Sequence, residues 1–85
     1  MKAFAGSAKT QNDIVNGVIS IAPRVCKGFT AGVLGENPVT FDFIGTGFSI
    51  TIKSGVSISK QVLDLSFTDV AISGTSPDFL LVFLA

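Results

Sequence analysis

The sequence predicts an all-β domain, a small antiparallel β-sandwich or barrel of about six to eight short strands. Short stretches of alternating apolar and polar residues dominate from about residue 14 onward, and turn-forming residues separate them at roughly 8–12-residue intervals. The polar positions are filled mainly by sixteen serine and threonine residues, which suit the face of a pleated sheet. Because no long helical pattern, repeat or second domain is visible, we assign residues 10–85 to a single β domain.

The first nine residues differ in character, and we expect residues 1–9 to form an N-terminal arm. They are mostly small, contain one aromatic residue, Phe4, and have no turn-bounded partner strand nearby. Such a segment gains little by packing on its own chain. We therefore predict that it becomes ordered on a neighbouring molecule, with Phe4 as its anchor.

The next segment, residues 10–19, is compatible with two structures. Asn16-Gly17 stands between two pairs of β-branched residues, a strong signal of a two-residue hairpin because both turn positions need a positive φ. Alternatively, residues 10–13 cap a helix whose apolar residues recur four positions apart. We favour the hairpin, since Gly17 and the β-branched residues disfavour so short a helix.

The clearest strands are residues 39–44 and 48–53, each with its apolar side chains on one face. The apolar parity switches between them. A three-residue hairpin loop at residues 45–47 explains the switch, and a β-bulge inside one bent strand is the alternative. A weaker strand is expected within residues 25–34, ahead of a loop around Pro38.

The stretch from residue 56 to residue 72 alternates well but changes phase twice. Its apolar residues are even-numbered at the start, odd-numbered in the middle and even-numbered again at the end. Two phase changes require two bulges or turns, which we place near residues 60–61 and 68–69. Turns at residues 53–55 and 74–78 separate this stretch from its neighbours.

The last strand is apolar on both parities. Successive side chains of a strand point to opposite faces, so both of its faces need cover. A chain of 85 residues has little mass to bury both, which favours an assembly in which a second molecule covers one of them. With the arm anchor, these residues are the interface candidates: Phe4, Phe79, Leu80, Leu81, Val82, Phe83 and Leu84.

No residue pattern points to catalysis. The chain contains no histidine, which removes the commonest general base and metal ligand. Its single cysteine, Cys26, is best explained as a small buried side chain, and Asp42 and Asp64 as residues on solvated strand faces. We therefore expect no catalytic, cofactor-binding or metal-binding residues and no cofactor, in a protein that is not an enzyme.

Charge and hydropathy limit the possible partners. Six basic and six acidic residues balance, the basic ones are scattered, and no tryptophan or tyrosine is present to stack on bases, so we expect no nucleic-acid binding. Residues 1–9 lack the apolar stretch of a secretory signal, and the terminal apolar run is far shorter than the roughly 20 residues of a membrane helix. We expect synthesis in the cytoplasm without a signal peptide, and no membrane association.

The chain combines short length, strands rich in glycine, serine and threonine, only 14% charged residues and an apolar terminal strand. In these features it resembles the small β-rich accessory proteins of tailed-phage virions, such as head-decoration or tail-attached proteins. The resemblance implies a non-catalytic structural subunit of the virion. It also implies homo-oligomers, with trimers favoured, that bind a larger protein lattice such as a capsid or tail.

A second function from a different class is a carbohydrate-binding β-sandwich module. In that case the loops around residues 32–36, 45–47 and 74–78 would form the site. The absence of tryptophan and tyrosine disfavours it, because sugar platforms usually combine a stacking ring with a polar tip.

Overall fold

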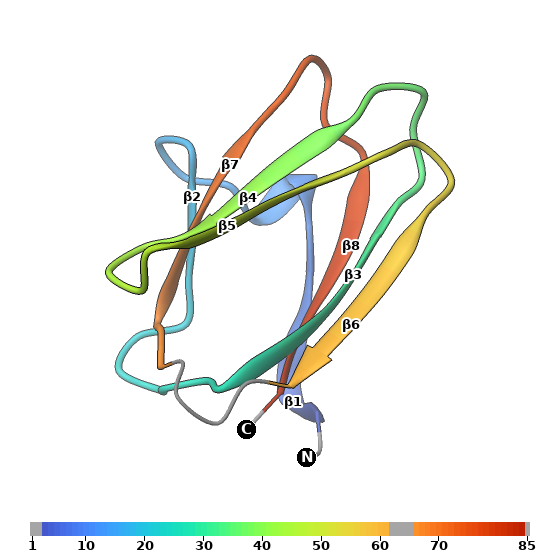
Figure 1. Ribbon diagram of the computed structural model, residues 1–85. Coiled ribbons are helices and arrows are strands. Elements are labelled where there is room, and N and C mark those ends of the chain that lie inside the picture. Colours follow the sequence, from blue (N-terminus) through green and yellow to red (C-terminus); the bar gives the residue numbers. More distant parts are fainter. Residues whose placement is uncertain (1–2, 62–65, 85) are drawn as a thin grey trace.

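The computed structural model describes residues 3–61 and 66–84, with only the backbone described for residues 3–5, 60 and 61. Its strands form two four-stranded antiparallel sheets packed face to face, which confirms the predicted all-β sandwich (Figure 1). The first sheet has the order β1 (Ala3–Thr10), β8 (Phe79–Leu84), β3 (Gly28–Val33), β6 (Ser57–Gln61). The second sheet has the order β2 (Val18–Ser20), β7 (Asp69–Ser73), β4 (Val39–Phe43), β5 (Phe48–Ile52).

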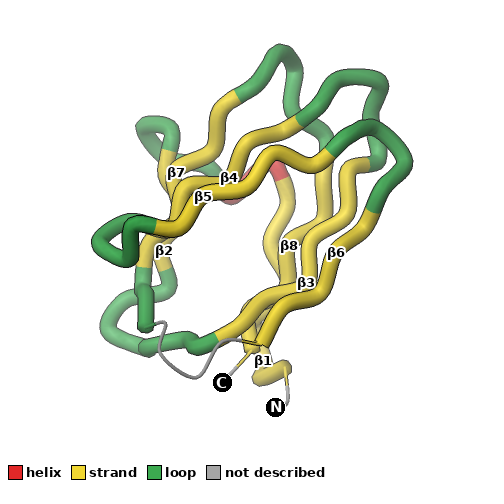
Figure 2. The backbone as a smooth tube through the Cα atoms, in the orientation of Figure 1, coloured by secondary structure: helices red, strands yellow, loops and turns green. Residues whose placement is uncertain are grey.

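The strand pairing follows one simple rule. β1 pairs with β8, β2 with β7, β3 with β6 and β4 with β5, all antiparallel. The described chain is thus a long two-stranded ribbon, folded at the β4–β5 turn and rolled up so that successive pairs alternate between the sheets (Figure 2). Two further antiparallel pairs, β3 with β8 and β4 with β7, complete the sheets. This winding is the jelly-roll arrangement of β-sandwiches.

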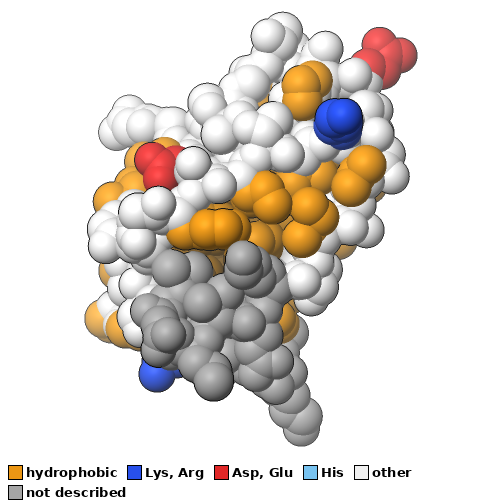
Figure 3. Space-filling view, viewed as in Figure 1, with side chains coloured by type: hydrophobic (Ala, Val, Ile, Leu, Met, Phe, Trp, Pro, Cys, Tyr) orange, Lys and Arg blue, Asp and Glu red, His pale blue; other side chains and the backbone are white. Residues whose placement is uncertain are grey.

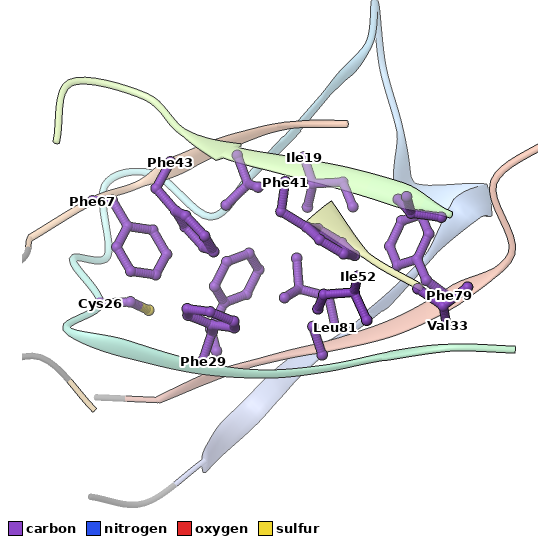
Figure 4. Close-up of a cluster of buried hydrophobic side chains, with 14 residues drawn as sticks. Ile19, Cys26, Phe29, Val33, Phe41, Phe43, Ile52, Phe67, Phe79 and Leu81 are labelled. Atoms are coloured by element: carbon purple, nitrogen blue, oxygen red, sulfur yellow. The ribbon is translucent and has the colours of Figure 1, made fainter. Parts of the chain in front are cut away.

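The core lies between the two sheets and is rich in phenylalanine (Figure 4). Phe43 is its centre, with ring centroids 4.5 Å from Phe29 and 4.9 Å from Phe67. These rings come from both sheets and from the segment before β7, so they join distant parts of the chain. The buried hydrophobic residues are Ile19, Cys26, Phe29, Ala31, Val33, Val39, Phe41, Phe43, Ile52, Phe67, Val70, Phe79, Leu81 and Phe83.

The hairpin at Asn16-Gly17 is confirmed. Val15 and Val18 exchange backbone hydrogen bonds of 2.9 and 3.0 Å, and Asn16 and Gly17 have φ values of 52° and 78°. The alternative helix in this segment is limited to one short turn. Thr10 caps only a single turn of 3-10 helix, η1 (Gln11–Asp13), because the hairpin begins directly after it.

The β4–β5 hairpin is also confirmed, in preference to a bulge in one bent strand. Phe43 and Phe48 are paired, so the loop has four residues, Ile44 to Gly47, where we expected three. Thr46 accounts for the extra residue, because its hydroxyl donates to the Phe43 carbonyl at 2.6 Å and accepts from the Phe48 N–H at 3.0 Å.

The two predicted phase changes fall at strand ends. The first lies where β6 ends, and the odd-numbered apolar residues that follow it, Leu63 and Leu65, lie outside the described residues. The second lies where β7 begins, after Phe67 pairs with Cys26 as an isolated bridge. The turn at residues 53–55 leads from β5 in one sheet to β6 in the other.

The N-terminal segment differs from the expected arm. Residues 3–10 form β1 and pair with β8, with a register shift between Ala3 and Ala8 and a positive φ of 79° at Gly6. The pairing satisfies backbone groups along one edge of β8, which is otherwise open. The Phe4 side chain lies outside the described residues.

Candidate interaction surface

The predicted interface residues of β8 divide between two faces. Phe79, Leu81 and Phe83 point between the sheets and are at most 1% exposed, so a partner cannot reach them in the folded chain. Leu80, Val82 and Leu84 point out of the first sheet, where Leu80 is 42% exposed and the other two are partly exposed. One chain therefore covers one face of β8 and leaves the opposite face open.

The outer residues of β8 belong to a larger surface on the outer side of the first sheet, which we call the leucine face. The register places Val82 beside Ala8 of β1 and Thr30 of β3, and Leu80 beside Gly32. No described side chain of this face carries a charge. Its members are Ala8, Thr10, Thr30, Gly32, Ser57, Ser59, Leu80, Val82 and Leu84.

Small and hydroxyl residues surround the leucines of the leucine face. A Cβ on Gly32 would lie 3.1 Å from the Cβ of Ser57, closer than ordinary contact, so glycine permits the close approach of β3 and β6. Thr30 and Ser59 hydrogen-bond to each other at 2.9 Å across the same strands. Their polar groups are thereby partly satisfied within the sheet, which lowers the cost of covering them.

The only cysteine is a core residue. Cys26 is fully buried, and this burial raises the pKa of its thiol, an effect that Arg24 opposes. A raised pKa keeps the thiol protonated and unreactive, which is the reverse of what a nucleophile needs. The structure therefore places Cys26 where the sequence predicted it.

The carboxylates do not gather into a site in the described part of the chain. Asp42 is exposed on β4, and Asp69 accepts a hydrogen bond of 2.6 Å from the hydroxyl of Ser20 on the adjacent strand. Asp64 lies outside the described residues. Among residues 3–61 and 66–84 there is no cluster of potential metal ligands and no pocket.

The loops suggested for sugar binding lie at different ends of the sandwich (Figure 1). The loops at residues 34–38 and 74–78 adjoin, since the Asp78 carbonyl accepts from the Leu34 and Gly35 N–H groups at 2.8 and 3.1 Å. The β4–β5 loop is at the other end of β4. The three loops do not form one site.

The structure also shows an open edge that sequence reasoning missed. β5 is the last strand of its sheet, and hydrophobic side chains gather on the face between β5 and β6 (Figure 3). Ile50 of β5 and Ile58 of β6 pack against the core there and are only partly buried. The alternation of residues 48–52 identifies the strand, but only the strand order shows that it is an edge.

No family model, curated protein or solved structure is significantly similar to the chain, so its function must be inferred from its own residues and geometry. Among the described residues, no helix has the length and hydrophobicity needed to span a membrane.

Proposed function

We propose that this chain is a non-catalytic structural subunit that associates with copies of itself and attaches to a larger protein lattice, such as the capsid or tail of a phage virion. The leucine face is the surface of attachment. The observation that supports this role is the row of Leu80, Val82 and Leu84, which lies exposed or partly exposed on an outer sheet face without a described charge.

Attachment through this face has a clear driving force. Burying apolar surface yields about 25 cal/mol per Å², and covering a half-exposed leucine therefore yields on the order of 1 kcal/mol. A single leucine is too weak to offset the loss of rotational and translational freedom on binding. A lattice repeats its binding sites, however, so an oligomeric subunit gains from several faces at once.

The fold agrees with this role but does not decide it. Jelly rolls include both viral capsid domains and lectin domains, and a fold by itself does not define a function. The described leucine face is aliphatic and hydroxyl-rich and presents no aromatic ring, which suits contact with another protein sheet better than stacking on a sugar. The surface chemistry therefore favours the structural role.

The test is cosedimentation of the purified chain with particles isolated from its biological source. We expect the wild-type chain to sediment with a phage particle and Leu80→Asp to remain in the supernatant, because an aspartate would be desolvated in the contact. Val15→Asp is the matched control, since Val15 is 69% exposed and lies at the Asn16-Gly17 hairpin of the second sheet, not on the sheet that carries the leucine face. Binding that is equally strong for both variants contradicts the proposal.

A further inference from the structure

In the part of the chain that the structure describes, the sandwich has four edge strands, and three of them have features that discourage pairing with another chain. β1 contains the register shift near Gly6, β2 has only three residues, and β6 includes Lys60. Bulges, short strands and lysines are the usual means by which proteins protect sheet edges. β5 has five residues with no charge, proline or register shift, so it is the unprotected edge.

The backbone groups at this edge can be identified from the neighbouring strands. The Ile44 N–H donates to the Asp69 carbonyl at 3.1 Å, so even-numbered residues of β4 hydrogen-bond to β7. Because the bonding direction alternates along a strand, odd-numbered residues of β4 bond to β5, and Phe41 faces Ile50. The N–H and C=O groups of Ser49 and Thr51 therefore point away from the sheet.

We propose that β5 pairs antiparallel with β5 of a second copy of this chain, about a two-fold axis through Ile50. In this register Ser49 lies opposite the partner's Thr51 and exchanges N–H···O=C hydrogen bonds with it. Ile50 lies opposite the partner's Ile50. The sheet β2-β7-β4-β5 of one copy and the same sheet of the other copy then form one continuous sheet across the dimer. The inference rests on the proposed self-association and identifies the surface that performs it.

A second copy fits this edge because the strand pattern reads the same in both directions. Phe48, Ser49, Ile50, Thr51 and Ile52 alternate apolar and hydroxyl residues symmetrically about the centre. Antiparallel self-pairing therefore places hydroxyl opposite hydroxyl on the outer face and apolar opposite apolar on the inner face. No like charges meet, and each Ile50 covers the partly buried Ile50 of its partner.

Disulfide trapping tests the register directly. Two residues that face each other in a non-hydrogen-bonded antiparallel pair have Cα atoms about 4.5 Å apart, within the range that a disulfide allows. We expect Ile50→Cys to form a disulfide-linked dimer under mild oxidation, while Cys26 stays buried and unreactive. Val15→Cys is the control, because Val15 is 69% exposed at a hairpin distant from β5 and should remain monomeric on a non-reducing gel.

Proline substitution provides an independent test of the backbone bonds. Thr51→Pro removes an N–H that points away from β4, and sheet edges tolerate proline at such positions. We expect light scattering to show twice the chain mass of 8.8 kDa for the wild type and the single-chain mass for Thr51→Pro, with unchanged circular dichroism. The control Thr40→Val, in the interior strand β4, loses the same 2.8 Å hydroxyl contact between Thr40 and Thr51 that the proline variant loses, and it should retain the wild-type mass.

Two outcomes overturn the β5 pairing. One is cross-linking of Ile50→Cys no faster than that of Val15→Cys, and the other is a folded Thr51→Pro variant that keeps the wild-type mass. Either result leaves the proposed attachment unchallenged if the wild-type chain sediments with the phage particle and Leu80→Asp does not. A chain that cross-links through Ile50→Cys but never binds a phage particle supports the dimer and contradicts the proposed attachment.

Discussion

Leu80 and Leu81 are neighbours in the chain but project to opposite faces of β8, so placing a charge at each has different consequences. Leu81 is fully buried. Losing a buried leucine costs about 2–5 kcal/mol, and burying an unpaired charge adds several more. An 85-residue domain has a total stability of only about 4–13 kcal/mol. We therefore expect Leu81→Asp to be unfolded.

Leu80 is 42% exposed, and an aspartate there can remain in contact with water. We expect Leu80→Asp to lose no more than about 1 kcal/mol, which shifts the urea midpoint by less than about 1 M for a domain of this size. Circular dichroism is the assay, because the chain has no tryptophan or tyrosine to report by fluorescence. If both variants unfold alike, or if Leu81→Asp keeps the wild-type midpoint, the assignment of the two faces is refuted.

Further predictions concern Cys26 and two glycines. A thiol reagent should label Cys26 only as fast as the chain unfolds, because the side chain is fully buried. Burial also raises the pKa of this thiol, so its contribution to the free energy of unfolding should be complete below the ordinary thiol pKa of about 8.5 and should decline as the pH rises beyond it. Urea titrations at several pH values would measure this decline. Gly17→Ala should cost about 1 kcal/mol, since Gly17 has a φ of 78° but open space around its Cα. Gly74→Ala should cost more, because its φ is 143° and the new Cβ would lie 2.8 Å from the Pro38 carbonyl oxygen; equal urea midpoints for the two glycine variants would contradict this reasoning.

Local signals in the sequence predicted the local structure well. Asn16-Gly17 favoured a tight hairpin over a short helix, because both turn positions need a positive φ, and the parity switch after Phe43 indicated either a turn or a bulge, of which the structure has the turn. These features depend on residues close together in the chain. The hairpin and the turn can therefore be predicted without knowing which residues pack against them.

The role of each strand in the sheets was not readable in the same way. The apolar residues of β8 predicted cover on both faces, but not that the odd-numbered side chains would enter the core of the same chain. The arm hypothesis for residues 1–9 assumed that no partner strand was available, whereas β8, at the far end of the sequence, pairs with β1. Such long-range pairing depends on the whole topology, which periodicity does not encode.

For the candidate surfaces, too, the sequence predicted the residues but not their arrangement in the sheets. The sequence identified Leu80, Val82 and Leu84 together with Phe79, Leu81 and Phe83, but it could not separate the outer row from the core row. It did not identify β5 as an edge, because an alternating strand looks the same in the middle of a sheet and at its margin.

The nested pairing of the strands also determines the order in which the strand pairs can form during synthesis. On the ribosome, β4 and β5 can pair as soon as both have emerged, whereas β1 must wait for β8, the last strand of the ribbon to be made. The hairpin at the fold of the ribbon is thus free to form early, and the sheet that carries the leucine face is completed last. Assembly through that face must therefore follow the synthesis of β8, because a chain still lacking β8 has neither the leucine row nor the strand that holds β1 in place.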